Sequence, residues 1–242
     1  MTRIYFTICT LLMCINCAWA QDNIPTIDPI ATYTSSVEGE DETKGFSAPL
    51  YGRFEANPEN VGGWNEYYEW RFTLESEKEE NHEPYLIRYE QDTEYTFTKA
   101  GTHRIVCYAI FTQGNDTIAY TDEYWNERGA LSVTISDSKL EMPNAFSPND
   151  DKTNDIYKPK KAQSLVEFRA IIFNRWGQKV YEWHDPNGGW DGTWNGKPAK
   201  EGVYFVDVTA KGSDGRHYHI RRDVNLIRGF RQTESTSSNT TN

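Results

Sequence analysis

Two histidines, His217 and His219, lie close together in the sequence, and their spacing could begin a metal site. Residues two apart in a strand point to the same face of the sheet, so both rings would face one way. A zinc ion is usually bound by about four ligands, and we identify no further candidate ligands in the sequence. We therefore predict surface histidines and no metal site.

Residues 149–155 place oxygen-bearing side chains at alternate positions, as a calcium-binding loop does: Asn149, Asp151, Thr153 and Asp155. The segment also contains a lysine, and it lacks the glycine and the distal bidentate glutamate of such loops. These features favour a turn built from Asn and Asp side chains at the start of a domain. We expect weak calcium binding or none, which melting with and without calcium would test.

The sequence contains no recognisable catalytic nucleophile. It lacks the Gly-x-Ser-x-Gly elbow, the His-Glu-x-x-His pair and a glycine-rich phosphate loop after a strand. Three of the four cysteines lie in the first twenty residues, and the fourth, Cys107, lies within the apolar run Ile105–Phe111. We interpret Cys107 as a small buried hydrophobe rather than a reactive thiol. We therefore expect that the chain is not an enzyme and that it has no catalytic residue, no cofactor and no metal.

Five tryptophans lie close to expected turns: Trp64, Trp125, Trp176, Trp190 and Trp194. Exposed indole rings could stack on sugars or on a protein partner, because each offers a large apolar face and one polar N–H. Tryptophans at the corners of a β-sandwich can instead cap the core. Both interpretations stay open from the sequence.

Alternation of apolar and polar residues predicts several strands, and the unbroken apolar run Ile105–Phe111 predicts a central strand that is covered on both faces. The expected strands are Tyr68–Leu74, Ile105–Phe111, Leu131–Ile135, Phe168–Phe173, Gln178–Trp183, Tyr204–Ala210 and Tyr218–Leu226. Turns rich in Gly, Asn and Asp separate them, and no segment carries a sustained helical period. Short strands at this spacing indicate an all-β chain of antiparallel sandwiches.

Charge divides the chain at Pro143. Residues 21–142 hold 24 acidic and 9 basic side chains, a net charge of −15, whereas residues 143–242 hold 12 acidic and 15 basic ones, a net charge of +3. Such a shift in composition supports two domains, which we place at 46–142 and 143–228. The net charge of all 242 residues, −11, opposes a phosphate backbone, so nucleic-acid binding is not expected.

The two ends of the chain differ from the domains. Residues 1–20 combine Arg3, an apolar stretch and the ending Ala18-Trp19-Ala20, which predicts a cleaved secretory signal peptide. Lipidation of Cys17 is an alternative, although the residue before it is not small. No later segment reaches the roughly 20 apolar residues of a membrane helix. Residues 21–45 and 229–242 are polar, and we expect a flexible segment and a disordered tail.

Several ordered motifs of the second domain resemble a known family. They are Pro143–Asn149, Ile172–Val180, Gly189–Pro198, Gly202–Tyr204 and the closing Leu226–Arg228. Together they resemble the gliding-motility-associated C-terminal domain, also called the type B sorting domain, of proteins exported by the type IX secretion system of Bacteroidota. The resemblance implies an immunoglobulin-like sandwich that acts as an address for transport across the outer membrane.

The resemblance also implies a route, partners and a recognised surface. The protein would enter the periplasm by the general secretory pathway. The type IX machinery and an outer-membrane protein of the PorP/SprF type would then route it to the cell surface or the medium. The residues implied to shape the recognised surface are Arg175, Trp176, Gly177, Trp190, Asp191, Gly192 and Trp194.

Residues 46–142 are more weakly similar to polycystic-kidney-disease-type (PKD) immunoglobulin-like domains, through Trp70–Phe72 and Glu94–Val106. The chain is thus expected to be a non-enzymatic exported protein of two immunoglobulin-like antiparallel β-sandwiches. Two alternatives stay open. A stationary envelope component would dock on an outer-membrane partner without release, which cell fractionation would detect. A carbohydrate-binding adhesin would bind glycans through residues 46–142, which a glycan array would test.

Overall fold

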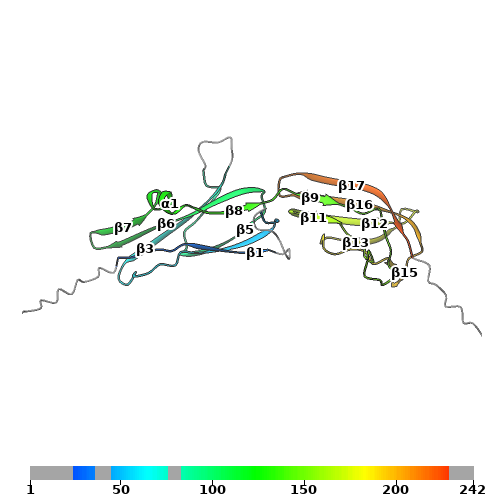
Figure 1. The fold of residues 1–242 in the computed structure, drawn as a ribbon, viewed down its shortest axis with the longest axis horizontal. Coiled ribbons are helices and arrows are strands. Elements are labelled where there is room, and N and C mark those ends of the chain that lie inside the picture. Colours follow the sequence, from blue (N-terminus) through cyan, green and yellow to red (C-terminus); the bar gives the residue numbers. More distant parts are fainter. Residues whose placement is uncertain (1–23, 36–44, 76–82, 229–242) are drawn as a thin grey trace, which may run out of the picture.

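A computed structural model of the chain describes residues 24–35, 45–75 and 83–228. These residues form two β units that lie end to end (Figure 1). Strands make up most of both units, so the predicted all-β fold class is confirmed. The expected signal peptide and the expected tail lie outside the described residues, as does part of the expected flexible segment 21–45. Within that segment Ile30–Ser35 forms a strand that pairs with Leu50–Glu55, so the expected flexibility does not hold there.

The first unit contains two sheets whose strands all pair antiparallel. One sheet has the order β1-β2-β5, with β1 (Ile30–Ser35), β2 (Leu50–Glu55) and β5 (Asp92–Phe97). The other has the order β4-β3-β6-β7, with β4 (Leu86–Arg88), β3 (Asn65–Leu74), β6 (Gly101–Gln113) and β7 (Asp116–Tyr120), and β8 (Leu131–Ile135) also pairs with β6. Their inward side chains form one core, in which the rings of Phe54 and Phe72 lie 5.1 Å apart.

A short helix, α1 (Asp122–Arg128), follows β7 and is not predicted by the sequence. Its seven residues are too few to show a helical period, which needs a window of about 11 residues or more. The helix buries Trp125, whose Nε1 donates a hydrogen bond to the carbonyl oxygen of Cys107 at 2.8 Å, so this tryptophan caps the core. Burial raises the pKa of the Cys107 thiol to about 12, which keeps it protonated. Among the described residues, no helix is long and apolar enough to cross a membrane.

One buried titratable group of the first core is His103. Its Nε2 lies 2.8 Å from the carbonyl oxygen of Lys99, which can only accept, so the proton of the neutral ring sits on Nε2. The hydroxyl of Tyr85 then donates to Nδ1 at 2.8 Å. Desolvation by burial lowers the pKa of His103. The folded chain therefore binds fewer protons at this site than the unfolded chain does.

We expect His103 to make the stability of the first unit depend on pH. Because its folded pKa is lowered, the free energy of unfolding falls as the pH drops below about 6.5, by at most about 1.4 kcal/mol per pH unit from this group. Urea unfolding at about pH 7.5 and about pH 5.5 measures the slope. His103→Gln should flatten the slope, whereas His217→Gln, at an exposed histidine, should not. An equal slope in wild type and His103→Gln would contradict the prediction.

The second unit is built on one five-stranded sheet with the order β10-β17-β16-β12-β13. Its strands are β10 (Ala145–Phe146), β17 (His217–Leu226), β16 (Gly202–Gly212), β12 (Leu165–Phe173) and β13 (Lys179–Trp183). Two ribbons accompany it, β9 (Lys139–Glu141) with β11 (Lys161–Gln163) and β14 (Thr193–Trp194) with β15 (Lys197–Pro198). The pair β10-β17 is parallel, and the other pairs are antiparallel. Leu140 and Met142, which precede Pro143, already pack in the core of this unit.

The register of the sheet gives the second unit two distinct ends. Leu165, at the start of β12, pairs with Gly212 at the end of β16, whereas Phe173, at the end of β12, pairs with Phe205. At about 3.3 Å per residue, β12 separates the two ends by roughly 30 Å. We call the end at Leu165 the proximal pole and the end at Phe173 the distal pole.

The first unit covers the proximal pole. The N–H of Ala48 donates to Ser164 Oγ at 3.2 Å, and the N–H of Ala100 donates to the carbonyl oxygen of Ser213 at 3.0 Å. Both serines are buried, and Val166 of β12 packs against the core of the first unit. The distal pole, with β15, lies at the end away from the first unit (Figure 1).

Candidate functional site

The distal pole includes a tight turn between β12 and β13. Asn174 is buried and organises this turn, because its Oδ1 accepts hydrogen bonds from two backbone N–H groups, including that of Trp176 at 2.9 Å. Gly177 has a φ of 76°, a left-handed conformation that glycine adopts without strain. The turn holds the Trp176 side chain in solvent, 76% exposed. The Arg175 guanidinium lies 5.4 Å from the centroid of the Trp176 ring, as in a cation–π contact.

The second motif segment begins at Trp190, which is fully buried. Its ring lies 5.2 Å from that of Phe146 and 4.9 Å from that of Tyr204, and its Nε1 donates to the carbonyl oxygen of Thr193 at 2.7 Å. The Oδ1 of Asp191 accepts hydrogen bonds from the N–H of Thr193 at 2.9 Å and from its hydroxyl at 2.7 Å. Trp190 and Asp191 thus fix the shape of the loop that leads into β14.

The side chain of Arg228 connects three loops at the distal pole. Its Nη2 donates to the carbonyl oxygens of Gly192 at 3.0 Å and Ala199 at 3.3 Å, and its Nη1 donates to that of Pro148 at 3.3 Å. Gly192 has a φ of 78°, and a Cβ there would lie 2.8 Å from Pro148 Cγ, so this position requires glycine. The N–H of Arg228 donates to the carboxylate of Glu201. One residue therefore holds together several segments that are far apart in sequence.

A groove of about 600 Å³ lies between the Trp176 turn and the ribbon β14-β15. Its apolar lining comprises Trp176, Trp194, Pro198, Ala199, Val203 and Tyr204. Its charged lining comprises Arg175, Lys197, Lys200 and Glu201. Concave sites of this size, with apolar walls and a few polar groups, are typical of ligand- and partner-binding surfaces. We call this candidate site the distal groove.

The structure divides the seven expected site residues into two groups. Arg175, Trp176 and Trp194 line the distal groove, and Gly177 shapes the turn beside it. The other three do not line the groove but hold the loop that leads into β14: Trp190, Asp191 and Gly192. The same residue type thus serves two purposes, since one tryptophan is buried as a support and another is presented to solvent.

Sequence reasoning did not nominate three further residues of this region. Lys197 and Lys200 lie on the groove, and Arg228 ties its loops together. For Lys197, which lies in β15, the available signal was the Gly189–Pro198 motif that contains it. Lys200 lies outside the motifs, so no signal was available for it. For Arg228 the signal was the closing Leu226–Arg228 motif, which ends on the residue that connects the loops.

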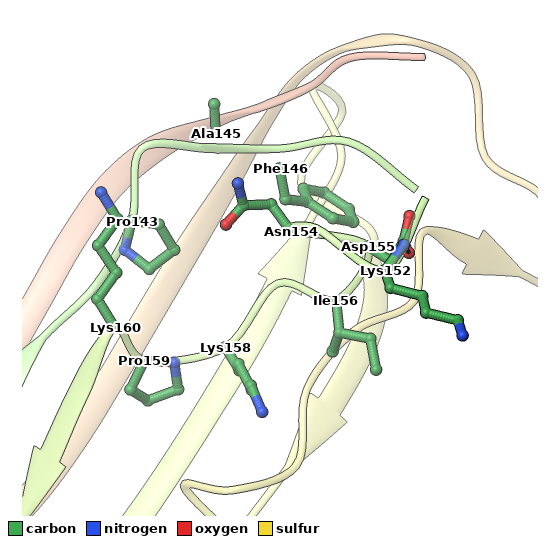
Figure 2. A pocket seen from close by; sticks show the side chains of 10 residues that line it. All are labelled: Pro143, Ala145, Phe146, Lys152, Asn154, Asp155, Ile156, Lys158, Pro159 and Lys160. Atoms are coloured by element: carbon green, nitrogen blue, oxygen red, sulfur yellow. Dashed lines mark hydrogen bonds between the residues drawn. The ribbon is translucent and has the colours of Figure 1, made fainter. Parts of the chain in front are cut away.

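A second hollow, of about 450 Å³, lies beside the 149–155 segment (Figure 2). The Oδ1 of Asp155 accepts hydrogen bonds from the N–H groups of Asn149 at 2.8 Å and Asp150 at 2.9 Å, and its Oδ2 accepts that of Lys152 at 2.7 Å. These hydrogen bonds, that of Asn149 first, hold the pKa of Asp155 below its ordinary value. The carboxylate that a calcium site needs is thus the centre of an Asn/Asp turn.

The remaining polar candidates do not gather into a site. Figure 2 shows the three lysine side chains of the second hollow pointing in different directions. His217 and His219 lie on β17 and are exposed, and the Nε2 of His219 lies 3.1 Å from Asp207 Oδ1. Within the described ranges, no group of three or more His, Cys, Asp or Glu side chains is placed to hold a metal ion.

Residues 140–220 match the profile of the CHU_C type IX secretion signal domain. The second unit is therefore similar to this family, and the predicted resemblance to a type IX sorting domain is confirmed. A type IX secretion signal implies export to the cell surface or the extracellular space. The match does not include residues 46–139, so the PKD-like character of the first unit stays a prediction. Comparison with curated proteins gives no match.

Two solved structures show a low similarity to the chain. The tetra-tandem repeat in the extending region of a large adhesion protein is 12% identical, with a TM-score of 0.27, and the match covers 83% of this chain and 50% of that one. Dimeric latent PorU from Porphyromonas gingivalis is 11% identical, with a TM-score of 0.24, and the match covers 86% of this chain and 21% of that one. The chain thus spans half or less of these two structures.

Proposed function

We propose that the chain is an exported, non-enzymatic protein of the cell surface or the medium, and that the type IX machinery docks on its distal groove. One observation carries this proposal: Arg175, Trp176 and Trp194, from two separate motifs, line the same groove. Trp176 is 76% exposed there. Large apolar side chains gathered at an exposed hollow mark interaction sites in soluble proteins.

The position of the groove supports the same proposal. The first unit covers the proximal pole through contacts at Ser164 and Ser213, whereas the groove opens at the opposite pole. A receptor that acts on the sorting domain while cargo is attached needs a surface that the cargo does not cover. The distal pole meets that requirement.

The proposed route begins with removal of residues 1–20 and release of the chain into the periplasm. The distal groove then engages the secretion machinery, in which a PorP/SprF-type outer-membrane protein is the proposed partner. The acidic first unit is the passenger, for which we propose a binding or structural role without catalysis or cofactor. The alternative of a stationary envelope component predicts the same groove but a chain that stays in the envelope, so fractionation of wild-type cells separates the two.

Trp176→Ala tests the proposed docking surface. We expect surface or extracellular delivery to fall about tenfold or more, because an exposed aromatic that becomes buried on docking contributes strongly to binding. The variant should accumulate in the periplasm in a folded state, since the side chain contributes little to the core. Cell fractionation with immunoblotting measures the delivered fraction.

Phe205→Ala is the matched control, because Phe205 is also an exposed aromatic of the second unit but does not line the groove. It should be delivered normally. Normal delivery of Trp176→Ala would remove the support for the distal groove as the docking surface.

A further inference from the structure

The rim of the distal groove carries cations without a carboxylate partner in the described part of the chain. Lys197 and Lys200 form no ion pair there, and Arg175 stacks on the neighbouring indole ring. The acid that lines the groove, Glu201, has its carboxylate engaged by a backbone N–H. The rim therefore presents positive charge that is free to meet an anionic partner.

Between these cations the lining is apolar and held in place. The hydroxyl of Tyr204 donates to the carbonyl oxygen of Lys200 at 2.8 Å, which fixes the Tyr204 ring. Val203 is 44% exposed, and the side chain of Trp194 is half-buried. Covering apolar surface of this kind removes it from water, which is the main driving force of protein association. A groove whose walls are already ordered loses little conformational freedom when a partner binds.

We infer that the distal groove binds an extended protein segment of the secretion machinery in which an aromatic or aliphatic side chain is flanked by carboxylates. The apolar side chain lies between Trp176 and Trp194, and the carboxylates meet the cations of the rim. Charge complementarity selects this partner, since a basic segment would meet like charges at Arg175, Lys197 and Lys200. The inference rests on the proposed function and adds to it the chemistry of the partner.

Selection from a random peptide library displayed on phage, with the purified full chain as bait, tests this inference. Wild type is expected to enrich peptides with Asp or Glu beside an aromatic or aliphatic residue, and Trp176→Ala is expected to recover them about tenfold less. A charge-reversed double variant, Lys197→Glu with Lys200→Glu, is expected to enrich Lys and Arg instead of the acids. Lys161→Glu with Lys211→Glu, near the proximal pole, is the matched control and should keep the acidic preference.

Several outcomes would overturn the inference. They are a wild-type preference for uncharged or basic peptides, an unchanged preference in the charge-reversed variant, and the lack of any peptide whose recovery depends on Trp176. Self-association of wild type that is lost on charge reversal would identify a second copy as the occupant and would overturn it as well.

Delivery in the host separates this inference from the proposed function. Suppose that Trp176→Ala is retained in the periplasm while charge reversal changes neither delivery nor peptide preference. The proposal that the machinery docks on the distal groove is then supported, and the inference that the partner is acidic is rejected. If Trp176→Ala is delivered normally, the proposed function fails, whatever peptides the groove selects.

Discussion

Replacing Trp190 with alanine is expected to destabilise the second unit by about 3–5 kcal/mol, the range measured for deleting a large buried aromatic side chain. The Trp190 ring is 0% exposed and packs between Phe146 and Tyr204, and its Nε1 donates to the carbonyl oxygen of Thr193. Alanine would leave a cavity and an unpaired carbonyl group at the same place. Since whole domains are stable by only about 5–15 kcal/mol, this loss would remove a large share of the stability of the unit.

Trp176→Ala is the matched variant, because it removes the same side chain from the same pole. Its indole ring is 76% exposed, so we expect a change within about 0.5 kcal/mol, as for ordinary surface substitutions. Hydrogen–deuterium exchange of the second unit distinguishes the two variants without relying on tryptophan fluorescence. Equal protection in Trp190→Ala and Trp176→Ala would contradict the division between a supporting and a presented tryptophan.

Some of the strands were predictable because apolar and polar residues alternate along them. β8 has the bounds expected from alternation, Leu131–Ile135, and β16 shows the same two-residue period in its buried positions. The helix α1 was not predictable, since its seven residues bury one side chain, Trp125, and one buried position defines no period. The parallel pairing of β10 with β17 also escaped prediction, because two-residue strands carry no pattern of their own.

The distal groove was predictable in part. The motifs contain residues that line the groove, but they could not tell which tryptophan is buried, because Trp176 and Trp190 both lie beside glycines in turn-rich segments. The difference arises from tertiary packing: Trp190 meets the aromatic core, whereas the turn organised by Asn174 directs Trp176 into solvent. Long-range hydrogen bonds cannot be predicted from the sequence either. The carbonyl partners of Arg228 lie 29 to 80 positions away along the chain.

The two groups of motif residues depend on one another. A groove that recognises a partner needs exposed apolar side chains, and exposed side chains are precise only when the backbone beneath them is fixed. Apart from the start of β16, the backbone here consists of short turns and a two-stranded ribbon of two-residue strands, which have little stability on their own. Side chains that hold these segments together must therefore supply the rigidity, and the partly buried Arg228 reaches three of them.

We therefore expect Arg228→Gln to loosen the distal pole and reduce delivery together. Glutamine cannot replace the three hydrogen bonds that the guanidinium makes to Pro148, Gly192 and Ala199, so the loss should be about 2 kcal/mol, allowing for water that reaches the freed carbonyl groups. Hydrogen–deuterium exchange should rise in residues 190–200, while β12 stays protected. Cell fractionation should show less protein at the surface.

Two further substitutions, one at Arg228 and one at Arg221, test whether the hydrogen bonds of Arg228 or only its charge matter. Arg228→Lys keeps the charge but loses the planar fork of donors, so it should fall between wild type and Arg228→Gln in both exchange and delivery. Arg221→Gln removes an exposed arginine of β17, the strand that precedes Arg228. Arg221 pairs with Asp207 at 3.0 Å, and such a surface pair contributes at most about 1 kcal/mol. If Arg221→Gln and Arg228→Gln behave alike, Arg228 only adds charge to the surface. If Arg228→Gln alone opens residues 190–200 and blocks delivery, the closing arginine holds the groove in the shape that the machinery recognises.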